Sequence, residues 1–191
     1  PRRKVGVVVV AAGSSRRMGG IEKVFLSLAG KPLVAHSLQT FEDSTLVDNV
    51  VLVVSDSARN DGEQIVTEFG YGKVVDVVVG GARRQDSVLR GMDRLPDCGI
   101  IMIHDGARPF VSGDIISRGL HAMRMASAAT AGVPVIDTIK IVDADMVVKS
   151  TPDRTTLWAA QTPQVFKSQL LREAHRRVTH DSTDDAAMVE A

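Results

Sequence analysis

Residues 5–15 read VGVVVVAAGSS, a run of valines that leads directly into a loop of small residues. Continuous β-branched runs are typical of strands that are covered on both faces, as in parallel sheets. A strand that ends in a turn of small residues presents accessible backbone N–H groups, which can hold an anion. We therefore predict a first strand over Val5–Ala11, followed by an anion-binding turn.

Further along the chain, similar apolar runs alternate with segments of helical spacing. The expected strands are Asn49–Ser55, Val74–Val79, Ile100–His104 and a weaker fifth, Ala131–Val135. The helical stripes between them are Leu33, Leu38 and Phe41; Ile65, Val66 and Phe69; Val88, Leu89, Met92 and Leu95; and Ile116, Leu120 and Met123. This alternation predicts an α/β fold with a mostly parallel sheet and right-handed crossovers.

The alternation ends after Pro134. Residues 137–150 (DTIKIVDADMVVKS) alternate polar and apolar side chains around a plausible turn, VDAD, which is typical of a β-hairpin. We predict an arm at about 137–157 that projects from a single domain over 1–191. Its apolar residues need cover, for which a second subunit is the simplest source; they are Ile139, Ile141, Met146 and Val148.

Bulk composition is that of an ordinary globular protein. Of 191 residues, 44% are hydrophobic and 24% charged, and 23 basic residues balance 23 acidic ones, so we expect neither nucleic acid nor a membrane surface as a partner. The single cysteine, Cys98, excludes an intrachain disulfide and favours a reducing, cytoplasmic setting. We interpret the basic N-terminus as the start of the first strand and not as a signal peptide.

The opening loop, AAGSSRRMG at 11–19, combines small residues with positive charge. Gly13 permits close approach of a phosphate, and Arg16, Arg17 and Lys23 supply cations. The loop is not a Walker motif, and Ser15 stands where a dinucleotide fingerprint has its second glycine, which disfavours a nicotinamide-binding dehydrogenase. Taken alone, the segment is also compatible with a tight turn and two solvated arginines.

Glycines and a serine follow the third strand in GGARRQDSV, at 80–88. Gly80 and Gly81 allow backbone contact with a flat ligand. Ser87 can cap the next helix, and helix starts bind anions. A helix cap and a turn without a ligand explain this segment equally well.

The fourth strand ends in HDGARP, at 104–109. Open α/β sheets bind ligands at the carboxyl ends of their strands, and Asp105 is a hard oxygen ligand that suits Mg²⁺. Arg108 can hold a phosphate with two hydrogen bonds. His104 is a possible base, but we favour a hydrogen-bonded histidine at the strand end, because attack by an ionised phosphate needs no base.

Three later segments complete the set of candidate residues. Asp137 and Thr138 begin the predicted arm, and Arg154 follows its return strand. QTPQVF spans 161–166, and TDDA spans 183–186. TDDA could simply begin a helix, with Thr183 as its N-cap and acidic residues in the first turn.

The order and rough spacing of these motifs resemble the 2-C-methyl-D-erythritol 4-phosphate cytidylyltransferase family over almost the whole chain. HDGARP together with QTPQ and TDDA is quite specific, whereas many nucleotidylyltransferases share the glycine loop. The resemblance implies a Rossmann-like sheet with a protruding β-arm, a homodimer formed through that arm, and transfer of a cytidylyl group from CTP to a phosphorylated polyol, with Mg²⁺ or another divalent cation.

The resemblance also implies roles for single residues. Arg17 and Lys23 correspond to the pair that stabilises charge at the α-phosphorus, and Asp105 to the metal ligand. The CTP contacts would be Ala11, Ala12, Gly13, Gly81 and Ser87. The contacts to the methylerythritol phosphate would be Asp105, Arg108, Thr138, Arg154 and Thr162, with Arg154 reaching into the partner's site.

Some features depart from the family's pattern. Ser15 replaces a usual glycine, and Glu22 precedes Lys23 where a proline is common. The family continues past TDDA with a strand and a helix that include a ligand-binding lysine, and we expect these to lie outside 1–191. Cytidylyl transfer to ribitol 5-phosphate and a non-catalytic nucleotide-binding module are the alternatives.

Overall fold

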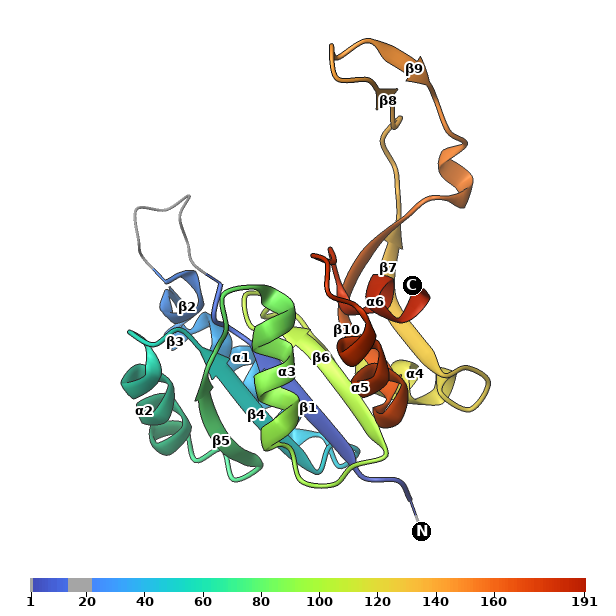
Figure 1. Cartoon of the computed structure of the whole chain (residues 1–191). Coiled ribbons are helices and arrows are strands. Elements are labelled where there is room, and N and C mark those ends of the chain that lie inside the picture. The colour runs from blue at the N-terminus through green and yellow to red at the C-terminus, as the bar shows by residue number, and fades with distance from the viewer. Residues whose placement is uncertain (1, 14–21) are drawn as a thin grey trace.

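A six-stranded sheet forms the body of the protein, and a long arm rises from one side of it (Figure 1). The computed structural model describes residues 2–13 and 22–191. The strand order is β5-β4-β1-β6-β10-β7. All neighbours up to β6 pair in parallel, whereas β10 pairs antiparallel with both β6 and β7. The predicted mostly parallel α/β sheet is confirmed.

The sheet strands are β1 (Val5–Val10), β4 (Asn49–Val54), β5 (Val74–Val79), β6 (Ile100–Asp105), β7 (Ala128–Pro134) and β10 (Trp158–Lys167). Short antiparallel pairs are β2 (Ser27–Leu28) with β3 (Lys31–Pro32), and β8 (Ile141–Val142) with β9 (Val148–Ser150). The α-helices are α1 (Leu33–Asp43), α2 (Arg59–Phe69), α3 (Arg84–Arg94), α4 (Gly113–Ala122), α5 (Ser168–Arg177) and α6 (Asp185–Glu190). In the described ranges, the 3₁₀ turns are η2 (Lys23–Phe25) and η3 (Arg154–Thr156).

Apolar side chains of the sheet fill one core on each face. Val7 and Val9 of β1 pack in the core that contains α1, α2 and α4 residues, while Val8 packs in the core of α3 and α5. Successive side chains of a strand point to opposite faces, so an unbroken valine run lets β1 serve both cores. The centre of the sheet is therefore rigid, and it fixes the strand ends where the candidate residues lie.

Some local predictions were wrong. Strand β10 was not predicted, because Pro163 interrupts its sequence; the structure accommodates it with a register shift between Ala160 and Gln164 against β7. The N-cap of α3 is Arg83, and Ser87 lies inside the helix. The N-cap of α6 is Asp184 and not Thr183, since the Asp184 side chain accepts a hydrogen bond from Ala187 N.

Leu89 is the one member of the predicted α3 stripe that points outward. It is 39% exposed, whereas Val88, Met92 and Leu95 are buried. The outer halves of β7 and β10 form the stalk of the arm, and β8 and β9 form its tip (Figure 1). At the predicted turn, Asp143 Oδ1 accepts hydrogen bonds from the backbone N–H groups of Asp145 and Val147. The predicted hairpin is thus confirmed.

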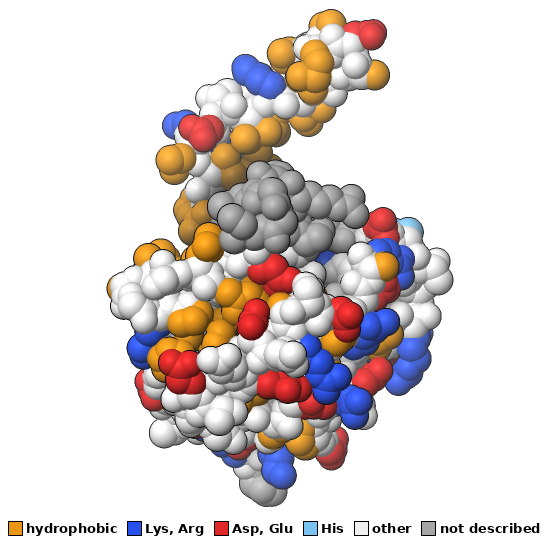
Figure 2. Space-filling view, turned by 90° about the vertical axis from the view of Figure 1, so that its left-hand side faces the viewer, with side chains coloured by type: hydrophobic (Ala, Val, Ile, Leu, Met, Phe, Trp, Pro, Cys, Tyr) orange, Lys and Arg blue, Asp and Glu red, His pale blue; other side chains and the backbone are white. Residues whose placement is uncertain are grey.

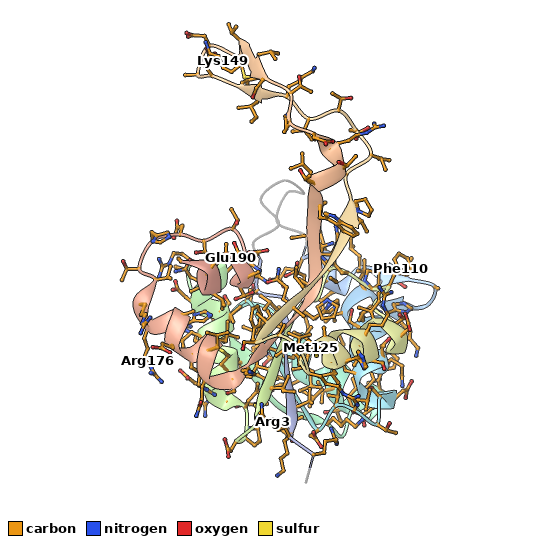
Figure 3. The ribbon with its side chains drawn as sticks, turned by 90° about the vertical axis from the view of Figure 1, so that its right-hand side faces the viewer. Arg3, Phe110, Met125, Lys149, Arg176 and Glu190 are labelled. Atoms are coloured by element: carbon orange, nitrogen blue, oxygen red, sulfur yellow. The ribbon has the colours of Figure 1, made fainter. Side chains whose placement is uncertain are left out.

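Apolar side chains gather along the arm (Figure 2). Ile136 is 80% exposed, Met146 76% and Trp158 63%, and the residues expected to need cover, Ile139, Ile141 and Val148, are exposed too. Lys149 lies near the far end of the arm, well away from the body (Figure 3). Within the part of the chain that the structure describes, no helix has the length and hydrophobicity needed to cross a bilayer.

Candidate functional site

A cluster of small residues lies where β1 and β5 end and α3 begins. A Cβ atom on Gly80 would lie 2.4 Å from Cβ of Ala12 and 2.7 Å from Oγ of Ser87, so only glycine permits this approach. The Ser87 hydroxyl accepts a hydrogen bond from Gly81 N (3.0 Å) and donates one to the Arg83 carbonyl (3.2 Å). The structure therefore brings Ala12, Gly81 and Ser87 together as predicted, with Ser87 bracing the glycine turn.

Ala11 and Gly13 flank this cluster in different ways. Ala11 is buried and its N–H donates to the Val53 carbonyl, so its side chain has a packing role at the end of β1. A Cβ on Gly13 would meet no atom of the described residues within 4 Å. A Cβ on Gly106 would lie 3.1 Å from that of Ala11, which ties the opening loop to the HDGARP segment.

Asp105 is the centre of a second cluster, at the carboxyl end of β6. Its Oδ2 accepts a hydrogen bond from Arg108 Nε (3.1 Å), and its backbone N–H donates to Thr162 Oγ1 (3.1 Å). Arg108 also donates to the side-chain oxygen of Gln161. Three predicted residues from two separate motifs thus meet at one point: Asp105 and Arg108 of HDGARP, and Thr162 of QTPQVF.

His104 contacts two residues of this cluster, Arg108 and Thr162. It is fully buried, and its Nε2 lies 3.1 Å from the Arg108 carbonyl while its Nδ1 lies 3.2 Å from Thr162 Oγ1. Burial lowers the pKa of His104 to about 4, so the ring is neutral at pH 7. The prediction of a hydrogen-bonded strand-end histidine is confirmed.

Sequence reasoning missed Arg84, which pairs with Asp105, and Asp185, which pairs with Arg84. Arg84 donates to Asp105 Oδ1 from Nη2 (3.1 Å) and to Asp185 Oδ2 from Nη1 (2.6 Å). Burial alone would lower the pKa of Arg84, but the two carboxylates hold it above its usual value. Both residues stood in quoted motifs, GGARR and TDDA, yet they are 101 positions apart, and no local pattern pairs them.

A cavity of about 260 Å³ opens in front of the second cluster. It is lined by Arg84, Asp105, Arg108, Ala160, Gln161, Thr162, Gln164, Thr183 and Asp184. Two arginines and several amide and hydroxyl groups make this cavity suitable for a phosphorylated, polar ligand. A larger hollow on the surface is formed by side chains of α2 alone and offers only an exposed helix face.

Among the described residues, Lys23 is not part of the cavity lining. Arg17 lies outside the described residues. Lys23 is exposed in η2, just after Glu22, whose side chain accepts hydrogen bonds from Ser55 and Ser57 and so attaches this segment to the loop after β4.

Thr138 and Arg154 belong to the arm and not to the cavity. Both are exposed, and Arg154 donates to the Ile136 carbonyl at 2.7 Å. The arm that carries them projects away from the body (Figure 1), and neither residue lines the cavity of its own chain.

A divalent cation would find a partial site at Asp105. Among the described residues no group of three His, Cys, Asp or Glu side chains could enclose a metal. Mg²⁺ commonly takes only one or two carboxylates and completes its shell with phosphates and water. Arg84 donates twice to Asp105 Oδ1, whereas Oδ2 faces a single donor, Arg108 Nε, and keeps a second lone pair, so this carboxylate fits a cation that arrives with a nucleotide.

The chain is similar to known proteins over almost its whole length. The sequence profile of the 2-C-methyl-D-erythritol 4-phosphate cytidylyltransferases matches residues 5–191. The chain belongs to this family. A cytidylyltransferase of that name from Dehalococcoides mccartyi is 45% identical over 187 residues, which cover 98% of this chain and 82% of the relative. One from Caldanaerobacter subterraneus is 42% identical over 192 residues, covering 97% and 85%.

Solved structures of the cytidylyltransferase family have the same fold. The 4-diphosphocytidyl-2C-methyl-D-erythritol synthase of Anaerococcus prevotii superposes with a TM-score of 0.88 at 26% identity, covering 98% of this chain and 82% of its own. The cytidylyltransferase of Thermus thermophilus gives a TM-score of 0.75 at 31% identity, covering 98% and 83%. The Rossmann-like fold predicted from the resemblance is therefore confirmed.

Proposed function

We propose that this protein transfers the cytidylyl group of CTP to 2-C-methyl-D-erythritol 4-phosphate and releases pyrophosphate, as a step in isoprenoid biosynthesis. The observation that carries the proposal is the meeting of Asp105, Arg108 and Thr162 in one cavity, next to the glycine cluster of β5 and α3. Family membership and the names of the relatives support the choice of both substrates.

The reaction is an in-line displacement at phosphorus. A phosphate oxygen of the acceptor forms a bond to the α-phosphorus of CTP, and the bond from that phosphorus to the bridging oxygen breaks. Pyrophosphate leaves with the electron pair, and no proton has to be removed from an ionised phosphate. Catalysis of such a step depends mostly on positioning and on cations that are already in place.

Each cluster contributes a different part of this arrangement. The small residues Ala12, Gly13 and Gly81 let the nucleotide lie against the backbone at the ends of β1 and β5. Arg108 and Thr162 bind the acceptor phosphate in the cavity. Arg17 of the opening loop and Lys23 of η2 offset charge on the α-phosphate. Ala11 and Ser87 support the nucleotide site through the packing and the hydrogen bonds described above.

Asp105 would hold Mg²⁺ or a similar cation together with phosphate oxygens and water. When bound, the cation supplies positive charge at the phosphates. The protein's own contribution there is a carboxylate of fixed orientation, whose hydrogen-bond partners are Arg84 and Arg108.

The arm suits a homodimer in which each copy completes the site of the other. Its exposed apolar residues need a cover, and its polar residues Thr138 and Arg154 are presented away from the cavity of their own chain. Arg154 of one copy would then bind the acceptor in the cavity of its partner. A cytoplasmic location is part of the same proposal, supported by Cys98, a buried single thiol that suits a reducing compartment.

An acceptor panel tests the function directly. The intact protein is incubated with CTP, MgCl₂ and either 2-C-methyl-D-erythritol 4-phosphate or ribitol 5-phosphate, and pyrophosphate release is followed. We expect release with the methylerythritol phosphate only. Pyrophosphate release with ribitol 5-phosphate alone would show that the acceptor is ribitol 5-phosphate. CTP binding without pyrophosphate release with either compound would show that the protein is a nucleotide-binding module and not this enzyme.

A further inference from the structure

Asp185, the second aspartate of the TDDA motif, is a buried carboxylate that does not line the cavity. It is 0% exposed at the first position of α6. Its Oδ2 lies 2.6 Å from Arg84 Nη1, while its Oδ1 has no hydrogen-bond partner among residues 2–13 and 22–191 and lies 3.7 Å from His175 Nε2. Burying a charge is costly unless it is paired, so Arg84 is the partner on which this carboxylate depends.

Arg84 joins the buried carboxylate to the one in the cavity. Its Nε and Nη2 atoms donate to the same oxygen of Asp105, Oδ1, at 3.3 and 3.1 Å. The guanidinium group is planar, so one rigid fork sets the position of Asp105 Oδ1 relative to Asp185. A lysine, with a single charged nitrogen, could not span both carboxylates in this way.

The start of α6, which carries Asp185, is attached to the sheet. The Asp184 side chain caps α6 and accepts a hydrogen bond from Gln164 Nε2 (2.8 Å), and Gln164 Oε1 accepts one from Ala186 N (3.1 Å). Gln164 belongs to the buried part of β10. The start of α6 is therefore attached to β10. The other end of the helix, Glu190, is labelled in Figure 3.

The two oxygens of Asp105 thus have different partners. Arg84, which also pairs with the buried Asp185, bonds to Oδ1. Arg108, which follows Asp105 by three residues, bonds to Oδ2. Arg108 has the more exposed side chain, 41% against 30% for Arg84, and its side-chain partners in the described part of the chain, Asp105 and Gln161, are only partly buried. A ligand can therefore draw Arg108 away from Oδ2 while Arg84 keeps Oδ1 in place.

We propose that Arg84 is a positioning residue which, anchored by the buried Asp185, holds the Asp105 carboxylate in its working orientation. This inference rests on the proposed function, because Asp105 acts on acceptor and cation in that reaction. It gives the TDDA motif a role beyond starting a helix: Asp185 acts on the cavity through Arg84. Loss of such supporting groups typically lowers ligand affinity or activity on the order of 10- to 100-fold.

The experiment compares Arg84→Lys and Asp185→Asn with a matched control, Arg83→Lys, in the intact protein. Arg83 is the neighbouring arginine, but it pairs with Asp86 and Asp181 outside the cavity. For each variant we would measure kcat, KM for 2-C-methyl-D-erythritol 4-phosphate, and calorimetric CTP binding with and without MgCl₂. We expect a 10- to 100-fold loss in kcat/KM for the acceptor in both test variants, about threefold or less in the control, and CTP affinity without metal within about threefold throughout.

If Arg84 and Asp185 serve stability alone, a double variant without either charge should regain wild-type kinetics. This variant therefore separates a positioning role from a purely structural one. Replacing both charged partners, as in Arg84→Met/Asp185→Asn, removes the unpaired buried charge and should preserve folding. We expect this variant to melt close to wild type but to keep the acceptor defect and to lose the gain in CTP affinity from MgCl₂. Recovery of both stability and acceptor kinetics would overturn the inference, as would wild-type kinetics in Asp185→Asn.

The wild-type protein distinguishes failure of this inference from failure of the proposed function. A wild-type protein that releases no pyrophosphate with CTP and the methylerythritol phosphate refutes the function itself. A wild-type protein that turns over normally, next to unaffected Arg84→Lys and Asp185→Asn variants, refutes only the positioning role.

Discussion

The same apolar residue types have opposite environments in the sheet and in the arm. Val8, Val51 and Ile101 in the sheet are 0% exposed, whereas Val148 and Ile136 in the arm are 54% and 80% exposed. In the sheet, two layers of helices provide the cover; along the arm, no described part of the chain does so (Figure 2). The comparison teaches that the body can fold on its own contacts, while the arm is built to be covered by something else.

The largest expected effect is on stability, in a matched pair of isoleucines. Ile101→Ala should lower the free energy of unfolding by about 2–5 kcal/mol, because it removes buried methyl groups and leaves a cavity. Ile136→Ala should change it by no more than about 0.5 kcal/mol, since the side chain is exposed in the single chain. Urea unfolding at low protein concentration measures both, and equal losses would show that the arm is packed like the body.

On the body, the largest functional effect is expected at Lys23. Lys23→Ala should lower kcat about 100-fold or more, the scale on which a preorganised charge-stabilising group contributes to catalysis. Steady-state pyrophosphate release with both substrates saturating is the measurement. An unchanged kcat would remove Lys23 from the charge-stabilising role.

Tyr71, the single tyrosine, reports on the buried side of the comparison. Its hydroxyl donates to the Ala35 carbonyl at 2.8 Å, and Tyr71→Phe should cost about 1 kcal/mol of stability. Burial, and then Asp43 and Glu42, raise the pKa of Tyr71 to about 12 from 10. Its contribution is therefore complete below pH 10 and is lost as pH rises through 12. Ultraviolet titration of the folded protein should show a midpoint near 12; a midpoint near 10 would contradict its burial.

Trp158, the single tryptophan, reports on the arm, and the shift expected in its fluorescence is the smallest of these effects. It stands in the stalk of the arm and is 63% exposed in the single chain. If a second copy covers the arm, its fluorescence should shift to longer wavelength when the protein is diluted and the copies separate. A spectrum that stays the same while sedimentation shows the change from dimer to monomer would mean that the interface lies elsewhere.

The sequence predicted most of the body because its signals are local. The valine run of β1 and the helical spacing of α3 depend on residues that are close in the chain, and the strand ends lie where these runs stop. The hairpin of the arm was equally visible, since Asp143 closes its turn with its own neighbours. Strand β10 was missed because Pro163 conceals it, and a register shift that no local pattern encodes accommodates the proline.

The candidate site divides in the same way. Asp105 and Arg108 could be proposed because they follow a recognisable strand, and Thr162 because its motif resembles the family's; their roles stay predictions. Arg84 could not, because its partners Asp105 and Asp185 are 21 and 101 positions away and only the folded sheet brings them together. The caps of α3 and α6 were assigned to hydroxyl residues on propensity, whereas Arg83 and Asp184 take those positions through contacts with Asp86 and Gln164.

The most direct test is whether a body and an arm from different copies make one site. Asp105→Asn removes the cavity carboxylate but leaves a normal arm, and Arg154→Ala does the reverse; each protein alone should be nearly inactive. Random pairing of equal amounts should restore about a quarter of wild-type activity, because half of the dimers then contain one complete site. A mixture no more active than the average of its two parents, after exchange of subunits has been verified, would contradict a site shared between two copies.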